Sequence, residues 1–290
     1  MDPQHFIAIH HHRYHAAKGV EAAVKSVVQA TRHLPAGSAR MVFFYDPESD
    51  LPADIHDLLA RLGVEKVMGF AASSGARLNS QIDLAIAAKA QIFYRVDADD
   101  VVAPRRFAHQ ATMFATSEID VCGGGLTYAV NDTHEHFDVI PKAIPGPWDY
   151  LLNCAMLHPT LAFRLDTFQK AGLRYWDQRL EDKHLGLQIR KAGLVLKNAP
   201  MILGHYHLDP ASRSSAQAAL LNLSLNKAYL KATRRFDLLP LAYLIFVSSM
   251  LAPSHQLRRM RQWMQRRPFS SASKSGGEND TTKTTRQPPE

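Results

Sequence analysis

The chain has 290 residues, of which 46% are hydrophobic and 21% are charged. This composition is typical of a globular protein with one large core, or with a large core and an appendage. Its two cysteines, Cys122 and Cys154, form no CxxC motif and indicate a reducing, cytosolic setting rather than a disulfide framework. The first residues contain no basic segment followed by a long apolar one, so we expect no signal peptide.

The net charge of +7 is unevenly distributed. Residues 256–268, QLRRMRQWMQRRP, contain five arginines and no acidic residue. A localised basic segment of this kind indicates an anionic partner rather than a uniformly basic protein. Residues 269–290 are polar and rich in Gly, Ser, Thr and Pro, and we expect them to form a disordered tail.

Strand and helix patterns alternate through the first half of the chain. The strand patterns are HFIAIHH (5–11), ARMVFFYD (39–46), VEKVMGF (64–70) and QIFYRV (91–96), and the helix patterns are 16–34, 52–63 and 74–90. Such alternation predicts a mostly parallel sheet that is covered by helices on both faces. Ligands of these sheets bind at the carboxyl ends of the strands. Asp46 and Asp97 both lie at the end of a strand pattern, so we expect them at one rim of the sheet.

The second half of the chain is less regular. It contains a glycine-rich strand pattern (119–130), a loop rich in proline and aromatic residues (140–150) and a helix pattern that begins near Glu181 and stops at Gly193. From residue 214 onwards the pattern is helical.

The apolar and basic segments near the C-terminus predict contact with a membrane surface. Residues 238–252, LLPLAYLIFVSSMLA, are apolar but shorter than the about 20 residues of a membrane-spanning helix. In the basic segment that follows, Leu257, Met260, Arg261 and Met264 share one helical face, which is typical of an interfacial helix on an anionic leaflet. The alternatives are a solvated basic helix that caps the core and a nucleic-acid site. Because no nucleic-acid-binding module is recognisable, we expect peripheral membrane contact and no nucleic acid.

Three carboxylates, Asp97, Asp99 and Asp100, crowd the end of the strand pattern QIFYRV. Each pair at contact distance costs about 1 to 4 kcal/mol, which a bound divalent cation would remove. Carboxylate oxygens suit Mg²⁺ or Mn²⁺, and the alternation of an extended backbone points Asp97 and Asp99 the same way. The alternative is a solvated turn in which Asp99 or Asp100 caps the helix after Pro104.

The segment YRVDADDVVAPRRFAHQ (94–110) resembles the signature of family 2 glycosyltransferases, in which DxDD is followed by a short apolar loop, a proline and a basic helix. SSGARLNSQIDLAIAAKA (73–90) is similar to the family's G...A.N.G...A helix, and residues 158–193 look like its acceptor-side segment with a Glu-Asp pair. The resemblance extends over about residues 6–215. It implies an α/β fold of the GT-A (Rossmann-like) nucleotide-diphospho-sugar transferase type, with a helical C-terminal appendage.

The same resemblance implies the domain boundaries. Residues 1–213 form a GT-A catalytic domain, with a nucleotide-binding half over about 1–115 and an acceptor half over about 116–213. Beyond the range of the resemblance, the apolar and basic patterns predict that residues 214–268 form a helical segment at the membrane surface, followed by the tail.

On the donor side, the resemblance implies that Asp46 contacts the nucleotide base or ribose and that Asp97 contacts the ribose or the metal. By the same resemblance, Asp99 would ligate the Mn²⁺ or Mg²⁺ ion that binds with the diphosphate of the donor sugar. Arg77 and Asn79 lie where the family approaches the donor. The metal neutralises charge as the nucleoside diphosphate leaves.

The sequence departs from the family pattern at two places. Tyr14 stands at the family's aromatic-Asn turn, where it either stacks on the base or packs in the protein. GHYHLDPASRSS (204–215) is similar to the family's Y-R-x-H-x-x-S end, but His207 and Asp209 occupy the Arg and His places. We assign His207 as the third metal ligand, with His205 and Asp209 left open as alternatives.

On the acceptor side, the resemblance implies that Asp182 is the general base that takes the proton of the acceptor hydroxyl, and that transfer inverts the anomeric centre. Its place in the first turn of a helix keeps a carboxylate ionised, as a base must be. Glu181 and Trp176 are expected nearby. The alternative for Asp182 is a helix-start carboxylate with no catalytic duty.

These observations together predict a metal-dependent, inverting glycosyltransferase that uses a nucleotide-diphosphate sugar. Its acceptor would be a saccharide or a lipid-linked sugar in cell-surface polysaccharide or glycolipid synthesis, on the cytoplasmic face of the inner membrane. The altered residues near His207 motivate an alternative, a catalytically inactive GT-A-fold binding protein. A sugar nucleotidyltransferase is disfavoured because HHHRYHAAKG has one glycine instead of a Gly-rich phosphate loop.

Overall fold

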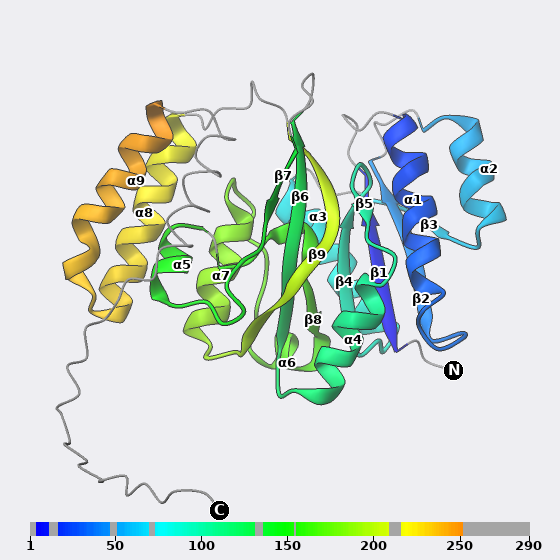
Figure 1. Ribbon diagram of the computed structural model, residues 1–290, viewed down its shortest axis with the longest axis horizontal. Coiled ribbons are helices and arrows are strands. Elements are labelled where there is room, and N and C mark those ends of the chain that lie inside the picture. Colours follow the sequence, from blue (N-terminus) through cyan, green and yellow to red (C-terminus); the bar gives the residue numbers. More distant parts are fainter. Residues whose placement is uncertain are drawn as a thin grey trace, which may run out of the picture.

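The computed structural model describes residues 4–11, 17–46, 51–69, 73–130, 136–153, 155–208 and 216–251. A sheet runs through the middle of the molecule with helices on both faces, and two further helices lie together at one end (Figure 1). The strands are β1 (His5–His10), β2 (Ala39–Tyr45), β3 (Glu65–Met68), β4 (Ile92–Asp97), β5 (Val101–Val102), β6 (Val121–Val130), β7 (His136–Val139), β8 (Ala162–Arg164) and β9 (Leu196–Leu208). The helices are α1 (Ala17–Thr31), α2 (Ala53–Arg61), α3 (Ser74–Ala87), α4 (Arg106–Thr116), α5 (Pro147–Leu151), α6 (Leu165–Lys170), α7 (Glu181–Lys191), α8 (Ala216–Thr233) and α9 (Leu239–Leu251), with short 3-10 helices η1 (His158–Thr160) and η2 (Phe236–Leu238).

Strands β1 to β4 form the parallel sheet that the sequence predicts, in the order β3-β2-β1-β4. The side chains of β1 alternate between two apolar cores, with Phe6 and Ala8 in one and Ile7 and Ile9 in the other. Helices α3, α6 and α7 contribute to the first core, and α1, α2 and α4 contribute to the second. Successive side chains of a strand point to opposite faces, so a strand that is buried on both faces is apolar along most of its length.

The strands of the second half of the chain, whose pattern is less regular, make the rest of the sheet mixed. Strand β8 is antiparallel to β4 and β6, β7 is antiparallel to β6, and β5 is antiparallel to β9, whereas β6 and β9 are parallel. Residues 131–135 join β6 to β7 and are too few for the crossover that a parallel pair needs. Strand β4, which ends at the carboxylates, therefore lies where the parallel half meets the mixed half.

Adjacent glycines in β6 allow neighbouring segments to approach its backbone. A Cβ atom at Gly124 would stand 2.3 Å from the Leu203 side chain, and one at Gly123 would stand 2.4 Å from Asn198 Oδ1. The Gly124 N–H donates to Thr160 Oγ1 at 3.0 Å. The glycine-rich pattern therefore reflects the close packing of β9 and η1 on β6.

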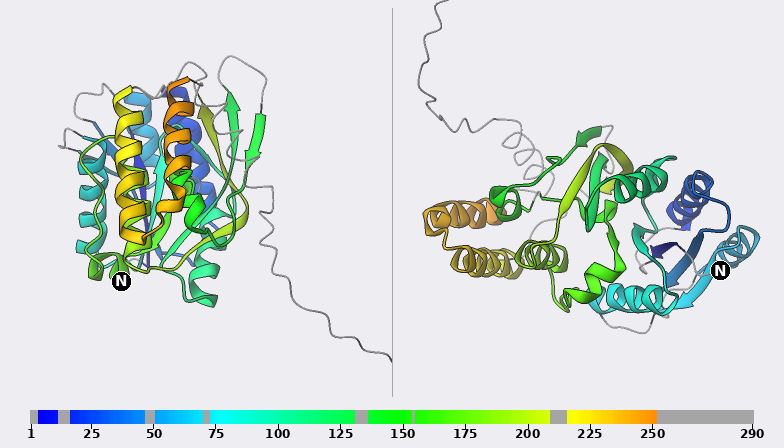
Figure 2. Two further views of the ribbon diagram at one scale, coloured as in Figure 1. Left: turned by 90° about the vertical axis from the view of Figure 1, so that its left-hand side faces the viewer. Right: turned by 90° about the horizontal axis from the view of Figure 1, so that it is seen from below.

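Helices α8 and α9 lie side by side at the end of the molecule opposite α2 (Figures 1 and 2). Their buried residues Leu223 and Ile245 belong to the same apolar core as side chains of α3 and α7. Lys183 of α7 is buried, and its Nζ donates to the Leu151 carbonyl at 3.0 Å and to Asn222 Oδ1 of α8 at 2.5 Å. The helical appendage is thus packed on the sheet domain through apolar and polar contacts.

Within the described residues, no helix combines the length and the apolar character that crossing a membrane requires. Helix α9 covers most of the apolar stretch 238–252. The following features of the sequence lie outside the described residues: Cys154, the expected domain boundary in 209–215, the basic segment 256–268 and the tail 269–290.

Candidate active site

The carboxyl ends of the parallel strands meet at one rim of the sheet, as the alternation of elements predicts. His10 at the end of β1 is aligned with Phe44 of β2 and with Asp97 at the end of β4. Asp46 directly follows β2. Asp46 and Asp97 therefore lie at the same rim, separated by β1.

Asp97, Asp99 and Asp100 form a tight turn directly after β4. The Asp100 N–H donates to the Asp97 carbonyl at 3.1 Å, and the Ala98 N–H donates to the His10 carbonyl at 2.9 Å. Ala98 and Asp100 are buried, whereas Asp97 and Asp99 are partly exposed. Among the three carboxylates, Asp97 and Asp99 are thus the two that reach solvent, as the alternation around buried Ala98 predicts.

The pKa of the buried Asp100 carboxyl group reflects its burial and the neighbouring carboxylates. Burial raises the pKa of Asp100 well above its usual value, and the charges of Asp97 and Asp99 raise it further. The guanidinium groups of Arg95 and Arg106 act in the opposite direction on the pKa of this carboxyl but do not cancel the rise. A cation near Asp97 and Asp99 would neutralise the excess negative charge.

The alternative role of these carboxylates as helix caps is not observed. Helix α4 begins at Arg106, its N-cap residue is Arg105, and no side chain makes a capping hydrogen bond there. Asp99 and Asp100 therefore lie between β4 and β5 and do not cap helix α4.

The turn is held in place from two sides. Helix α1 lies against it, since a Cβ atom at Gly19 would stand 3.8 Å from the Cα atom of Asp99. Ser26 Oγ of α1 accepts a hydrogen bond from the Val102 N–H at 2.9 Å. On the other side, β5 pairs with β9. These contacts fix the backbone that carries Asp99.

A buried guanidinium group lies beside Asp97. Arg95 Nη2 and Asp97 Oδ1 are 2.6 Å apart, and only 8% and 14% of the two side chains are exposed. Arg106, which is also buried, donates from Nη2 to the Arg95 carbonyl at 2.6 Å. Burial acts to lower the pKa of Arg95, but the nearby acidic groups, Asp97 first among them, raise it overall. Arg95 therefore stays charged and orients the Asp97 carboxylate.

Asp97 and Asp99 provide the hard oxygen donors that Mg²⁺ and Mn²⁺ prefer. Among the residues that the structure describes, no three His, Cys, Asp or Glu side chains are grouped so that they could hold a metal ion. Mg²⁺ is commonly bound by one or two carboxylates together with substrate phosphates. The two carboxylates therefore fit a metal ion that is shared with a bound diphosphate.

The third ligand suggested by the sequence would come from β9. His205 is aligned with Val101 of β5, and because the two strands are antiparallel, β9 continues through His207 towards the turn that contains Asp99. Both histidines are exposed, and neither forms a three-residue metal group with Asp97 and Asp99 within the described part of the chain, so the structure does not support the predicted third ligand. Asp209, the other alternative, lies outside the described residues.

A pocket of about 650 Å³ opens at the rim, between α3 and the ends of β1, β2 and β3. Its volume falls within the about 300 to 1,000 Å³ of small-molecule sites. Its polar lining residues are His10, His11, Arg77, Ser80, Gln81 and Asp83. Tyr45 and Phe44 add aromatic surface. Tyr14, which the sequence suggests for base stacking, lies outside the described residues.

Two polar pairs tie α3 to the strand ends around this pocket. Arg77 Nη1 and Asp46 Oδ2 are 2.8 Å apart, and 10% of each side chain is exposed. One turn further along α3, Gln81 Nε2 lies 2.7 Å from His10 Nδ1. The structure thus brings Asp46 and Arg77 together as an ion pair at the pocket, and it adds His10 and Gln81, which were not expected from the sequence.

The other side of α3 holds the segment that leads to α7. Asn79 Nδ2 donates to the Tyr175 carbonyl and Asn79 Oδ1 accepts from the Tyr175 N–H, both at 2.9 Å. Ser74 Oγ donates to Glu181 Oε1 at 3.2 Å. Asn79 therefore uses both ends of its amide within the protein, on Tyr175.

Trp176 lies between α3 and α7. The backbone passes so close to α3 that a Cβ atom at Gly75 would stand 1.9 Å from the Trp176 carbonyl oxygen. Ser73, the N-cap residue of α3, is hydrogen-bonded to Asp177. The partly exposed indole ring of Trp176 has its centre 4.8 Å from that of the His184 ring of α7. Trp176 is therefore a neighbour of the helix that begins at Glu181 and Asp182.

Asp182 lies in the first turn of α7, where the sequence predicts it. Its Oδ1 accepts a hydrogen bond from the Lys183 N–H at 2.7 Å. Burial raises the pKa of Glu181, and the charge of Asp182 raises it further, while Arg95 and Ser74 act to lower it. Glu181 therefore interacts both with the adjacent Asp182 and with the arginine that pairs with Asp97.

Tyr175 connects the two groups of carboxylates. Burial raises the pKa of its hydroxyl, which Arg95 acts to lower. The charges of Glu181, Asp182 and Asp97 add to the rise. One phenol is thus within electrostatic reach of the carboxylates at the end of β4 and of those at the start of α7. The two motifs, far apart in the sequence, thus lie near the same buried side chain.

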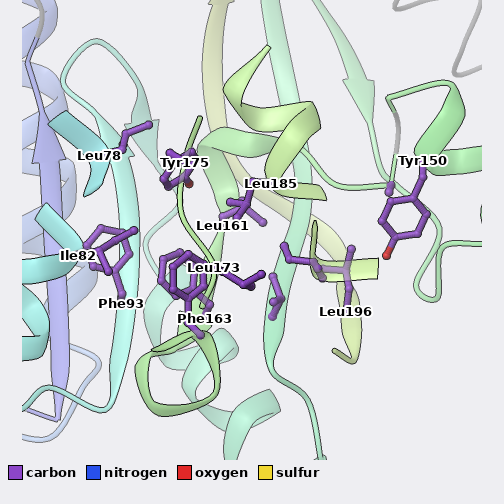
Figure 3. Close-up of a cluster of buried hydrophobic side chains, with 14 of the residues drawn as sticks. Leu78, Ile82, Phe93, Tyr150, Leu161, Phe163, Leu173, Tyr175, Leu185 and Leu196 are labelled. Carbon is purple, nitrogen blue, oxygen red and sulfur yellow. The ribbon is translucent and has the colours of Figure 1, made fainter. Parts of the chain in front are cut away.

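The ring of Tyr175 is fixed by neighbours on several elements. Figure 3 shows it between Leu78 of α3 and Leu161. Its hydroxyl lies 2.9 Å from His158 Nε2. Burial lowers the pKa of His158 well below the usual value, and the charge of Arg95 acts in the same direction. His158 is therefore neutral, and its hydrogen bond to the Tyr175 hydroxyl helps to hold the tyrosine ring in place.

Three residues of this centre were not expected from the sequence: Arg95, His158 and Tyr175. A signal for Arg95 was available, because alternation places it on the same side of β4 as Asp97, in an otherwise apolar strand. No pattern singled out His158 or Tyr175, since their roles depend on contacts between elements that are far apart in the chain.

No model of a known protein family matches the sequence, and no curated protein matches it either. Solved structures do match. The fragment 1–349 of S. aureus TarS in complex with UDP-GlcNAc has a TM-score of 0.59 at 12% identity, with 78% of this chain and 66% of that chain covered. The mannosyltransferase PcManGT from Pyrobaculum calidifontis in complex with GDP-Man and Mn²⁺ has a TM-score of 0.53 at 15% identity, with 90% and 79% covered.

The matched part of this chain spans 66% of the TarS fragment and 39% of a longer S. aureus TarS chain. At 12 to 15% identity, the similarity establishes the fold. The chain has the α/β GT-A-type fold of these glycosyltransferase structures, followed by a helical C-terminal part, which confirms the predicted fold class.

Proposed function

We propose that this chain is a metal-dependent, inverting glycosyltransferase that moves a sugar from a nucleoside-diphosphate donor to a saccharide or lipid-linked acceptor. The proposal rests on one observation: three features lie near one another at one rim of a GT-A-type fold. These are the pair Asp97 and Asp99, the 650 Å³ pocket beside α3, and the first turn of α7 with Asp182. The ligands of the two similar structures, UDP-GlcNAc and GDP-Man with Mn²⁺, support a donor of this class.

The pocket beside α3 is the proposed site of the nucleoside, with Asp46 and Arg77 at its edge. Asp97 and Asp99 would hold Mn²⁺ or Mg²⁺ together with the donor diphosphate, and the bound ion would neutralise charge on the departing nucleoside diphosphate. The ion pair with Arg95 orients the Asp97 carboxylate before the donor arrives. This preorganisation lowers the cost of assembling the site.

Asp182 is the proposed general base. It takes the proton of the acceptor hydroxyl as that oxygen forms a bond to the anomeric carbon, and the bond to the nucleoside diphosphate breaks on the opposite face. Glu181 and Trp176, which flank Asp182, would contact the acceptor. Tyr14 would stack on the donor base.

The proposal extends to the organisation of the chain and its location. Residues 1–213 would be the catalytic domain, with the donor site in about 1–115 and the acceptor site in about 116–213. Residues 214–268 would hold it on the cytoplasmic face of the inner membrane, where it would act in cell-surface polysaccharide or glycolipid synthesis. The apolar helix α9 and the five arginines of residues 256–268 support this location.

Donor turnover tests the proposed reaction. Release of nucleoside diphosphate is measured with UDP-, GDP-, CDP- and dTDP-sugars, each with Mn²⁺ and with a chelator. We expect the sugars of one nucleotide to be consumed, and only with the metal present. Metal-dependent binding of a nucleotide without turnover of any donor, in the presence of candidate acceptors, would instead support the inactive binding protein.

The Asn79→Ala variant is expected to lose transfer but keep donor binding. Removing the amide frees the Tyr175 backbone and with it the segment that leads to Asp182, and displacing a catalytic group by about 1 Å can cost about 100-fold in rate. The measurement is kcat together with the dissociation constant of the donor nucleotide. The control is Asn79→Asp, which keeps the acceptor for the Tyr175 N–H and should retain more activity. Weaker nucleotide binding with an unchanged kcat would assign Asn79 to the donor, as the family resemblance implies.

A further inference from the structure

The outward side of helix α9 is covered by apolar side chains. Leu244 is 61% exposed, Val247 47% and Tyr243 43%. These residues are spaced so that they share one helical face with Pro240, which is also exposed. On the opposite face, Ala242 and Ile245 are buried in the core, so α9 is apolar on both sides.

Packing in the core does not account for the apolar residues on the outward face of α9. A helix that is apolar all round is normally buried on all sides, whereas α9 lies at the end of the molecule with only one side against the protein (Figure 2). Phe236, in η2 just before α9, is 62% exposed, and Leu220 of the neighbouring helix α8 is 56% exposed. Clustered exposed apolar side chains of this kind mark an interaction surface.

Basic side chains accompany this surface. Lys227 of α8 places its Nζ 4.9 Å from the ring centre of Tyr243, so the exposed faces of the two helices adjoin. Lys231 and Arg234 are also exposed. Over residues 216–251 there are four Lys and Arg residues and one acidic residue, and the five arginines of 256–268 follow without an acidic residue. An apolar face with a basic border is complementary to an anionic lipid surface.

We infer that the exposed face of α8 and α9, defined by Leu220, Lys227, Phe236, Tyr243, Leu244 and Val247, docks on an anionic lipid surface. Helix α9 has 13 residues and is about 20 Å long, too short to cross a bilayer but suited to lie along its surface. A second copy of the chain fits this face less well, because a two-fold axis would bring the basic border of one copy towards that of the other. The lipid surface therefore matches both the apolar side chains and the charge.

Docking on this face would also bear on the proposed transfer reaction, and this step rests on the proposed function. Lys183, directly after Asp182, donates to Asn222 Oδ1 of α8 at 2.5 Å. The first turn of α7 is thus braced by the helix that docks. An acceptor held on a lipid would reach Asp182 from the surface on which the protein lies.

Vesicle co-sedimentation of the full chain tests the inference. Vesicles of phosphatidylcholine alone are compared with vesicles that also contain phosphatidylglycerol, at low and at high salt. We expect binding to the anionic vesicles that weakens as salt rises. The double variant Leu244→Glu/Val247→Glu should bind at least about tenfold more weakly, because two carboxylates would have to enter the interface.

The matched control is Val195→Glu/Met201→Glu, which places the same two charges at exposed apolar positions near β9, 43% and 38% exposed. It should bind vesicles as the unmodified chain does. Three results would overturn the inference: no binding of the unmodified chain to anionic vesicles, equal binding of the α9 variant, or a dimer in light scattering that the α9 variant alone dissociates. Vesicle binding requires neither donor nor turnover, so its failure is distinguishable from failure of the proposed reaction.

Discussion

Replacing Asp99 by asparagine is expected to abolish metal-dependent nucleotide binding while the fold stays intact. Asparagine keeps the size of the side chain but removes the negative charge that a divalent cation requires. Substitutions of residues that only support metal ligands cost about 10- to 100-fold in metal affinity, so the loss for a ligand should reach about 100-fold or more. The measurement is the affinity for the nucleoside diphosphate in the presence of Mn²⁺, with the unfolding temperature as the check on the fold.

The control for this substitution is Asp166→Asn. Asp166 is an exposed carboxylate of α6 whose Oδ2 lies 3.4 Å from Lys170 Nζ, on an element that contributes no residue to the pocket. It should leave nucleotide affinity unchanged. Unchanged Mn²⁺-dependent affinity in Asp99→Asn would remove Asp99 from the proposed metal site.

Replacing Asp182 by asparagine is expected to leave donor binding unchanged and to remove transfer. A general base contributes about 10² to 10⁴-fold to a rate, and asparagine cannot accept the proton. The side-chain oxygen of asparagine can still accept the hydrogen bond that the Lys183 N–H makes to Asp182 Oδ1, so the start of α7 should be preserved. The measurement is kcat for transfer, together with the dissociation constant of the donor.

Asp54→Asn provides the matched control, because Asp54 is a carboxylate in the first turn of α2 and is exposed to solvent. It should retain full activity. If Asp182→Asn also turned over at the normal rate, Asp182 would be a helix-start carboxylate without a catalytic role, the alternative that the sequence leaves open.

Local patterns predicted many of the individual elements. The strand pattern 39–46 became β2 (Ala39–Tyr45), and the helix pattern 74–90 became α3 (Ser74–Ala87). Both depend on hydrophobic periodicity, which the chain carries locally. The loop 140–150 was different, because most of the short helix α5 (Pro147–Leu151) lies within it. Five residues are too few for periodicity to reveal a helix.

The two faces of α3 carry separate roles, which helical spacing predicts but the family resemblance does not. Arg77 and Asn79 were expected together at the donor. Residues two apart on a helix do not face each other, and accordingly Arg77 lines the pocket with Gln81 while Asn79 holds Tyr175. Helical spacing alone would have separated the two roles.

Other parts of the site depend on contacts that no local pattern encodes. Arg95 meets Asp97 within one strand, but its electrostatic contact with Tyr175 and Glu181 arises only after α3, β4 and the start of α7 have packed together. The positions of Asp97, Asp99 and Asp182 agree with the sequence prediction. Their chemical roles stay predictions.

The most direct test of the central claim is a thermal unfolding panel of the full chain with UDP, GDP, CDP and dTDP, each with Mn²⁺ and with a chelator. A ligand at 100 times its dissociation constant stabilises the folded state by about 2.7 kcal/mol, a clear shift in unfolding temperature. The proposed site predicts that one nucleotide stabilises the chain with Mn²⁺ but not with the chelator, and that Asp99→Asn removes the effect. Stabilisation by none of the four nucleotides, or equal stabilisation with the chelator, would contradict it.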